Sequence, residues 1–158
     1  MERKSTPNIH SMLSEEARAL RTDLLNKLIA VNRPVYPEEI TLKENFDLTE
    51  SLQELKEKGL IVLQEDGAIT GLYPVSALKT PHKVQLEDGR SFYAMCAIDA
   101  LGAVYEFGQD LKISSSCKRC NTLISIASEE TRFVSVRPPT AHALHVAIEK
   151  YRNWAASC

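Results

Sequence analysis

Apolar residues in the first part of the chain recur at steps of three and four positions, which places them along one face of a helix. The spacing predicts a helix between Ser14 and Pro34. Ser14 is the expected N-cap, because its hydroxyl can accept a hydrogen bond from a first-turn backbone N–H. Pro34 cannot continue the helix. The apolar face consists of Ala17, Leu20, Leu24, Leu28 and Val31.

The segment that follows has the pattern of a small helix-and-hairpin unit. After a short helical turn, a second helix is expected between its cap Asp47 and its terminating Gly59, and a β-hairpin is expected over residues 60–73. This order is typical of a winged helix-turn-helix unit, which we assign to residues 14–75. Residues 1–13 are polar without a sustained period, and a loose tail is predicted there.

The second half of the chain has the alternation and turn signals of β-structure. A linker is predicted over residues 74–81, and a small β-rich domain is predicted over residues 80–158. Asp88–Gly89 is a strong hairpin signal. The expected fold class is α+β, in which a terminal helix closes the β-rich domain. The expected elements are strands over 82–86, 91–95, 111–113, 123–126 and 132–136, a helix over 96–102, and a last helix from Thr140 to near Trp154.

Composition excludes several classes of protein. Of 158 residues, 44% are hydrophobic and 25% are charged, so the chain can bury a core. Mean hydropathy is −0.21, and no run of 18 apolar residues occurs, so no membrane-spanning helix is expected. The beginning of the sequence lacks the apolar segment of a signal peptide, which favours a cytoplasmic protein.

Charge argues against nucleic-acid binding. The chain has 19 basic and 21 acidic side chains, a formal net charge of −2. The candidate recognition helix over residues 49–58 carries three glutamates against two lysines, so it repels phosphate. A structural role of the winged-helix-like unit is therefore favoured over DNA binding.

Four cysteines, at positions 96, 117, 120 and 158, are the first indication of chemistry. Reactive or metal-binding thiols are expected here rather than disulfides. Cys96 follows a predicted strand and opens a predicted helix, where backbone N–H groups and the helix dipole stabilise a thiolate. Asp99, three residues later, can exchange a proton with a group bound to that sulfur. From spacing alone, the alternative is a small buried Cys96 and a surface acid at Asp99.

Residues 89–101, with the sequence GRSFYAMCAIDAL, resemble the active-site segment of the alkylmercury lyases. That segment reads Gly-Arg-x-x-Tyr-x-x-Cys-Ala-Leu-Asp-x-Leu. Residues 113–117, Ile-Ser-Ser-Ser-Cys, are similar to a strand of the same family that ends in Ser-Ser-x-Cys. The winged-helix-like unit and the Tyr73–Pro74 junction fit the same organisation. The resemblance covers about residues 14–137.

The resemblance implies protonolysis of a carbon–mercury bond. In this family two cysteine thiolates bind the mercury and an aspartate delivers a proton to the departing carbon. Cys96 is then the expected first nucleophile, and Asp99 the expected proton carrier. Hg(II) is soft and binds sulfur strongly, so no organic cofactor is required. The expected partner is a small organometallic or metal ligand, without a membrane or nucleic acid.

One departure from the family pattern concerns the second thiol. The family's second catalytic cysteine follows the strand that corresponds to residues 132–136, and this chain has no cysteine there. Cys158 is the candidate second thiol, although a chain end preorganises a side chain poorly. Without a second thiolate, cleavage of the carbon–mercury bond is expected to be weak or absent.

Cys117 and Cys120 form a CxxC pair between two predicted strands. The pair favours a second hypothesis, a metal-binding or metal-sensing protein without lyase activity that holds a Hg or Zn ion. Zinc takes four ligands, of which the pair supplies two. A redox disulfide and passive thiols are the remaining alternatives. The residues considered for completing a site are Cys96, Cys158, His142 and His145.

Overall fold

The computed structural model describes residues 9–41 and 46–144. Within them the chain forms three α-helices, two short 3-10 helices and eight strands. The helices are η1 (Ile9–Met12), α1 (Glu15–Val31), η2 (Pro37–Glu39), α2 (Leu48–Glu57) and α3 (Ala97–Phe107). The strands are β1 (Ile61–Leu63), β2 (Ile69–Leu72), β3 (Val75–Ser76), β4 (His82–Leu86), β5 (Ser91–Ala94), β6 (Leu111–Ser116), β7 (Leu123–Glu129) and β8 (Arg132–Arg137). The predicted α+β class is confirmed.

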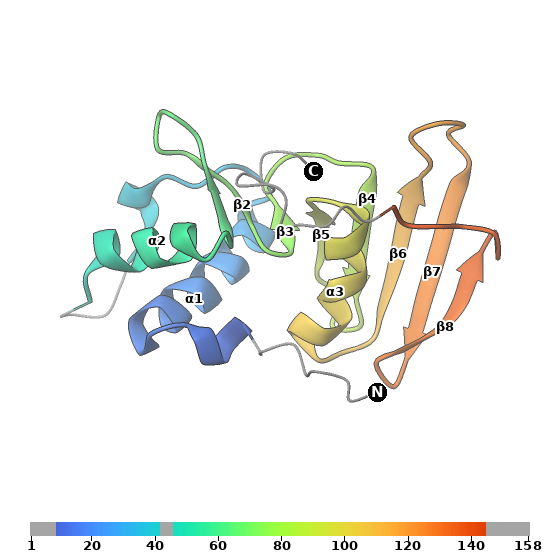
Figure 1. Ribbon diagram of the computed structural model, residues 1–158, viewed down its shortest axis with the longest axis horizontal. Coiled ribbons are helices and arrows are strands. Elements are labelled where there is room, and N and C mark those ends of the chain that lie inside the picture. Colours follow the sequence, from blue (N-terminus) through green and yellow to red (C-terminus); the bar gives the residue numbers. More distant parts are fainter. Residues whose placement is uncertain (1–8, 42–45, 145–158) are drawn as a thin grey trace.

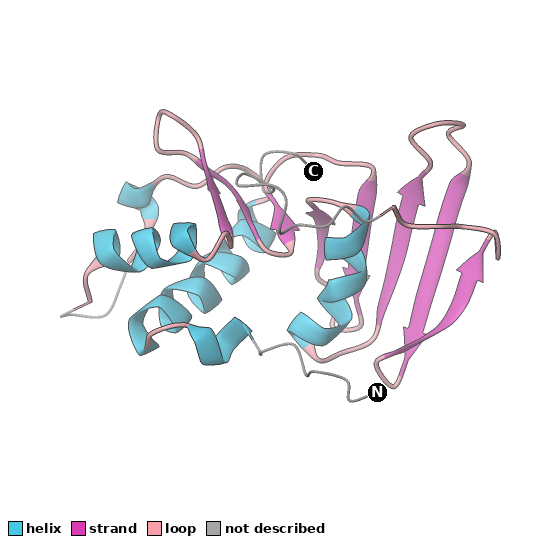
Figure 2. Cartoon of the chain, in the orientation of Figure 1, coloured by secondary structure: helices cyan, strands magenta, loops and turns pink. Residues whose placement is uncertain are grey.

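All eight strands belong to one antiparallel sheet in the order β1-β2-β3-β5-β4-β6-β7-β8. Helices α1 and α2 pack at the β1–β3 end, and α3 packs against β4, β5 and β6 at the centre (Figure 1). Figure 2 shows that β6, β7 and β8 extend the sheet beyond α3. The described helices therefore pack over the other strands and leave β7 and β8 largely uncovered.

The expected linker over residues 74–81 contains an element of the sheet. Strand β3 pairs with β2 through Leu72 and Val75, and with β5 through Val75 and Ala94. The expectation of a plain linker is therefore wrong for Val75 and Ser76, because pairing on both sides satisfies their backbone polar groups. The winged-helix assignment and the domain boundaries at 14–75 and 80–158 stay predictions.

Both predicted helix caps in the first half are present. The Ser14 hydroxyl accepts a hydrogen bond from the Ala17 N–H at 3.1 Å, and the Asp47 carboxylate accepts one from the Glu50 N–H at 3.0 Å. Asn32 ends α1 in the left-handed conformation, with φ of 49°. These are contacts between near neighbours in sequence, so sequence patterns predict them well.

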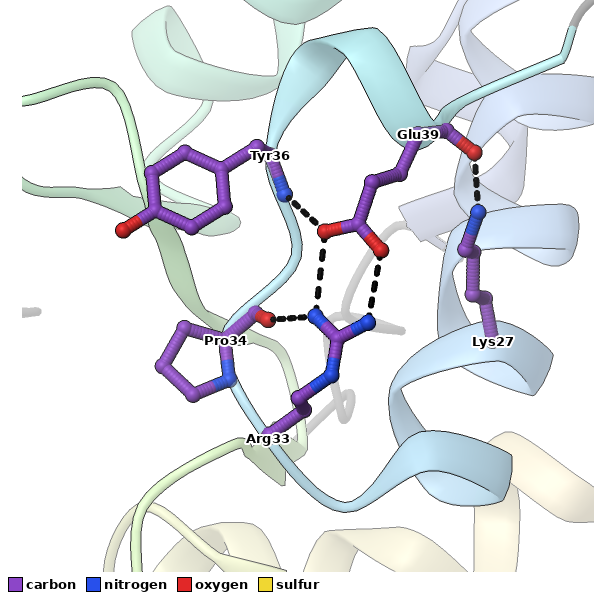
Figure 3. A network of polar contacts seen from close by, with 5 residues as sticks. All are labelled: Lys27, Arg33, Pro34, Tyr36 and Glu39. Carbon is purple, nitrogen blue, oxygen red and sulfur yellow. Dashed lines mark hydrogen bonds and ion pairs between the residues drawn. The ribbon is translucent and has the colours of Figure 1, made fainter.

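A network of polar contacts shapes the chain after α1 (Figure 3). The Arg33 guanidinium binds both carboxylate oxygens of Glu39, at 3.0 and 2.7 Å, and also donates to the Pro34 carbonyl at 2.8 Å. The Tyr36 N–H donates to the same carboxylate at 3.0 Å, and the Lys27 ammonium donates to the Glu39 carbonyl. The hydrogen bonds to this carboxylate, from Arg33 first and then from the Tyr36 N–H, lower the pKa of Glu39 to about 2. The network joins the end of α1 to η2.

Helix α3 is longer than predicted. The sequence indicates an end at Gly102, but the helix continues to Phe107 and is terminated by Gly108, with φ of 60°. Gly102 lies against the Tyr73 hydroxyl, and a Cβ at this position would collide with it. Gly102 is therefore a close-packing position inside the helix, not a helix terminator.

A buried ion pair joins α1 to α3. The Arg21 side chain is fully buried, and its Nη1 lies 2.5 Å from the Glu106 Oε1. Its Nη2 donates to the Tyr73 carbonyl at 2.9 Å. Since breaking a buried pair leaves an uncompensated charge, these contacts hold α3 in one position relative to α1. The helix that carries Cys96 and Asp99 is thereby anchored to the N-terminal half of the chain.

The predicted terminal helix is not formed at its expected beginning. Residues 141–144 adopt no regular secondary structure, and Ala141 N–H donates to the Pro138 carbonyl at 3.0 Å in a turn. The Thr140 carbonyl, which would accept the first hydrogen bond of that helix, lies 2.7 Å from the His142 Nδ1. The rest of that expected helix lies outside the described residues. None of the helices described is long and apolar enough to cross a bilayer.

Candidate active site

Cys96 lies at the junction between β5 and α3. It is the N-cap of α3, in an extended conformation with φ of −147°, and its sulfur accepts a hydrogen bond from the Asp99 N–H at 3.5 Å. The thiol is partly exposed. The sulfur therefore lies at the positive end of the helix dipole and within reach of solvent, which suits a nucleophile. The predicted strand–helix junction is confirmed.

The Asp99 carboxyl is buried against this thiol. Its residue is only 4% exposed, and its Oδ2 has no hydrogen-bond partner within the described part of the chain. Burial raises the pKa of Asp99 to about 6, and hydrogen bonds from Cys96 oppose this effect. The alternative of a surface acid is therefore wrong. A carboxyl group with this pKa holds a proton in a fraction of molecules near neutral pH and can donate it.

Tyr73 is the neighbour of this pair that sequence reasoning did not assign to the site. Burial first, and then the negative charge of Asp99, raise the pKa of Tyr73 to about 12. Tyr73 is therefore a neutral phenol at physiological pH, and its hydroxyl packs on Gly102 one turn along α3. The sequence drew attention to Tyr73 only through the Tyr73–Pro74 junction. Its contact with Gly102 joins distant segments, which sequence patterns do not reveal.

A pocket of about 200 Å³ lies beside the first turn of α3, between that helix and the open end of the sheet. Ala97, which directly follows Cys96, and Leu101 form its helix side. Mostly apolar side chains of the sheet form the opposite side, so the pocket suits a small organic group. The other residues of its lining are Ile113, Ser115, Ile124, Ile126, Phe133, Val136, Ala141, His142 and Ala143.

His82 lies on β4, between β5, which precedes Cys96, and β6, which precedes Cys117. Its Nδ1 is 3.0 Å from the Ser115 hydroxyl, and His82 pairs with Ser115 in the sheet. Burial first, and then the charge of Lys118, lower the pKa of His82. A neutral, half-buried His82 therefore lies beside Ser115, whose residue lines the pocket. The pairing of β4 with β6 brings these two residues together.

Cys117 and Cys120 lie in the tight connection between β6 and β7. The Cys117 N–H donates to the Thr122 carbonyl at 2.9 Å, and the Asn121 N–H donates to the Cys117 carbonyl at 2.8 Å. The Cys120 sulfur is 3.1 Å from the Thr122 hydroxyl. Hydrogen bonds from Thr122, and then from Cys117, lower the pKa of Cys120. Both residues are free thiols.

The structure thus places the predicted residues in two groups, Cys96 with Asp99 and Cys117 with Cys120. Among the described residues, no set of three or more His, Cys, Asp and Glu side chains is placed to hold a metal ion. His142 is exposed, and its Nδ1 lies 2.7 Å from the Thr140 carbonyl. Cys158 and His145 lie outside the described residues.

Comparison with known proteins connects this geometry to a family. The alkylmercury lyase (MerB) family model matches residues 75–158, slightly more than half of the chain. The chain belongs to the alkylmercury lyase family. An alkylmercury lyase of Staphylococcus epidermidis is 32% identical over 117 residues, which cover 74% of this chain. Alkylmercury lyases of Bacillus cereus and Clostridium butyricum are each 28% identical over the same length.

The chain spans about half of the length of these alkylmercury lyases, since the matches cover 53% of each relative. A solved structure, the mercury-bound form of MerB2, has the same fold with a TM-score of 0.63 and 20% identity. The match covers 82% of this chain and 64% of that one. Both groups of cysteines described above lie within the residues that match the family model.

Proposed function

We propose that this chain cleaves the carbon–mercury bond of organomercurials by protonolysis, with Cys96 as the nucleophile and Asp99 as the proton donor. The observation that carries the proposal is the burial of the Asp99 carboxyl beside the Cys96 sulfur, with its pKa raised to about 6. A proton donor must keep its proton near neutral pH and lie at the bond that breaks. Family membership supports the choice of this reaction.

The first step forms a sulfur–mercury bond. The Cys96 thiol loses its proton to solvent, and the sulfur displaces a labile ligand from the organomercurial R–Hg–X, giving Cys96–S–Hg–R. Mercury accepts sulfur readily because both are soft. Hydrogen bonding from the Asp99 N–H holds the sulfur at the helix start throughout this step.

The second step breaks the carbon–mercury bond. The Asp99 carboxyl donates its proton to the carbon, which leaves as R–H with the electron pair of the former bond. Mercury stays as Hg(II) on the Cys96 sulfur and takes a second thiolate as its other ligand. That second thiol gives up a proton, which restores the Asp99 carboxyl. We propose Cys158 for this role; it lies outside the described residues.

The apolar pocket beside Ala97 is the proposed place for the organic group. An organic group attached to mercury on Cys96 has to occupy space next to that sulfur, and the pocket begins at the following residue. Leu101 and Ile124 on its two sides offer apolar surface to an alkyl or aryl group. The pocket volume of about 200 Å³ accommodates a small substituent.

The test is release of benzene from phenylmercury by the full chain with excess monothiol. Wild-type protein is expected to release benzene, and Cys96→Ser and Asp99→Asn are expected to lose this activity. Tyr105→Phe is the matched control, since Tyr105 lies on α3 and is 75% exposed. Equal rates for wild type and Cys96→Ser would remove the proposal. If Cys158→Ser abolishes turnover and a higher monothiol concentration restores it, the result supports Cys158 as the second thiol.

A further inference from the structure

The β6–β7 connection presents two thiols side by side at the protein surface. Cys120 is exposed and Cys117 is partly exposed, and the Cys117 thiol is near enough to help lower the pKa of Cys120. Two backbone hydrogen bonds, from Cys117 to Thr122 and from Asn121 to Cys117, close the loop that holds them. The two sulfurs are therefore kept adjacent by the backbone before any ligand arrives.

The surroundings of this pair favour the thiolate form. The Thr122 hydroxyl lies 3.1 Å from the Cys120 sulfur and can donate to it. Lys118 and Arg119, the two residues between the cysteines, are both exposed, so neither side chain covers the thiol pair. Such an exposed thiol pair serves no purpose in packing a core, since it is not buried.

We propose that Cys117 and Cys120 form a second metal site, at which one Hg(II) ion is held between the two sulfurs. Two S–H bonds break, two Hg–S bonds form, and two protons pass to solvent. Hg(II) is a soft ion whose coordination two thiolates complete, whereas zinc takes four ligands. The inference does not rest on the proposed lyase activity, because its ligand is the inorganic ion.

Sheet topology places this site at the same end of the sheet as Cys96. Strand β5 ends just before Cys96, β6 ends just before Cys117, and only β4 lies between these strands. Two strand spacings amount to about 10 Å. Antiparallel pairing of β4 with both neighbours aligns the ends of β5 and β6. Hg(II) bound at Cys117 and Cys120 therefore lies at the same end of the sheet as Cys96.

The experiment uses the full chain with Cys96→Ser and Cys158→Ser, so that Cys117 and Cys120 are the remaining cysteines. The reduced protein receives one equivalent of mercuric chloride without oxygen, and native mass spectrometry measures the ion retained against increasing 2-mercaptoethanol. One Hg(II) per chain is expected. When Cys117→Ser or Cys120→Ser is added, the 2-mercaptoethanol concentration that removes half of the bound Hg(II) should fall by about 100-fold. The reason is that one sulfur alone cannot chelate the ion. Lys118→Ala in the same background is the control that keeps both sulfurs.

Two outcomes would overturn the site. If the variants with one remaining cysteine retain Hg(II) as well as the two-cysteine background does, the two sulfurs do not act as a pair. Stoichiometric retention of zinc, added as zinc chloride, would contradict a two-sulfur site. If the background variant does not fold, the wild-type chain is treated with iodoacetamide after one and after two equivalents of Hg(II). Protection of Cys117 and Cys120 together in peptide maps supports the site. Alkylation of either one after two equivalents overturns it.

Discussion

The Asp99 N–H donates to the sulfur of Cys96 across 3.5 Å, so the residue that caps α3 is also the proposed nucleophile. The same contact brings the Asp99 carboxyl, which is 4% exposed, to the base of the thiol. A helix start thus provides both a fixed sulfur and a desolvated acid within one turn. The pKa of about 6 for Asp99 results from this burial.

The pH dependence of cleavage is expected to follow Asp99. Since the pKa of Asp99 is raised to about 6, its proton-bearing form is lost above that pH, and kcat for substrate already bound to the Cys96 sulfur should fall about tenfold per pH unit on that side. Asp99→Asn has no carboxyl proton to donate and should be slower by about 100-fold or more. The measurement is benzene release from phenylmercury between pH 5 and 8. A wild-type rate that is constant over this range would contradict the assignment.

The same residue is expected to reduce stability at neutral pH. The folded state holds the Asp99 proton more tightly than the unfolded state, so its contribution is fully present at low pH and is lost as pH rises through about 6. Asp99→Asn should therefore raise the free energy of unfolding at pH 8 by on the order of 2 kcal/mol. Below pH 4 this gain should vanish. Urea unfolding at the two pH values checks it, and a gain that does not depend on pH would contradict burial as the cause.

The ion pair between Arg21 and Glu106 is expected to dominate the attachment of α3 to α1. Glu106→Gln leaves the guanidinium of a fully buried Arg21 without its carboxylate and should cost roughly 3–5 kcal/mol in urea unfolding. Glu39→Gln removes the partner of Arg33, which is half exposed, and should cost much less. Equal losses for the two variants would show that the pair between the helices is not buried in solution.

Gly102 is expected to tolerate no side chain while Tyr73 keeps its hydroxyl. Gly102→Ala improves helix propensity, but its Cβ collides with that hydroxyl, so a net loss of about 1–3 kcal/mol is expected. Combining it with Tyr73→Phe should recover most of the loss, because the colliding atom is gone. Thermal unfolding of the two single variants and the double variant measures this coupling. Additive effects would contradict the contact.

The apolar pocket is expected to discriminate between organic groups. Ile124→Trp adds volume to the pocket wall and should raise KM for phenylmercury more than for methylmercury. Leu123→Trp is the matched control, because Leu123 is 80% exposed and is not part of the pocket. If both variants affect the two substrates alike, the pocket does not hold the organic group.

Local sequence patterns predicted several elements well. The caps at Ser14 and Asp47 and the turn at Asp88–Gly89 all depend on residues within a few positions of each other. The junction at Cys96 is of the same kind, since its cap contact spans three residues. The resemblance of residues 89–101 to the alkylmercury lyases also required only contiguous residues, and family membership is confirmed.

Elements that depend on distant partners were predicted less well. Gly102 indicated the end of a helix, but it is enclosed by Tyr73, which lies 29 positions earlier in the chain. The expected linker contains β3, whose pairing partners lie on β2 and β5. Neither partner can be identified from propensity, because propensity reports only the neighbours along the chain.

The sequence by itself determined which reactive groups this protein has, where the strand–helix junction carrying Cys96 lies, and which family it belongs to. Tertiary structure alone decided that Asp99 is buried, that Tyr73 lies next to it, and that Cys117 and Cys120 reach the sheet end where Cys96 lies. The physical reason is that burial and strand register come from packing between distant segments. The pKa of a carboxyl group responds to that packing, and the spacing of three residues between Cys96 and Asp99 does not encode it.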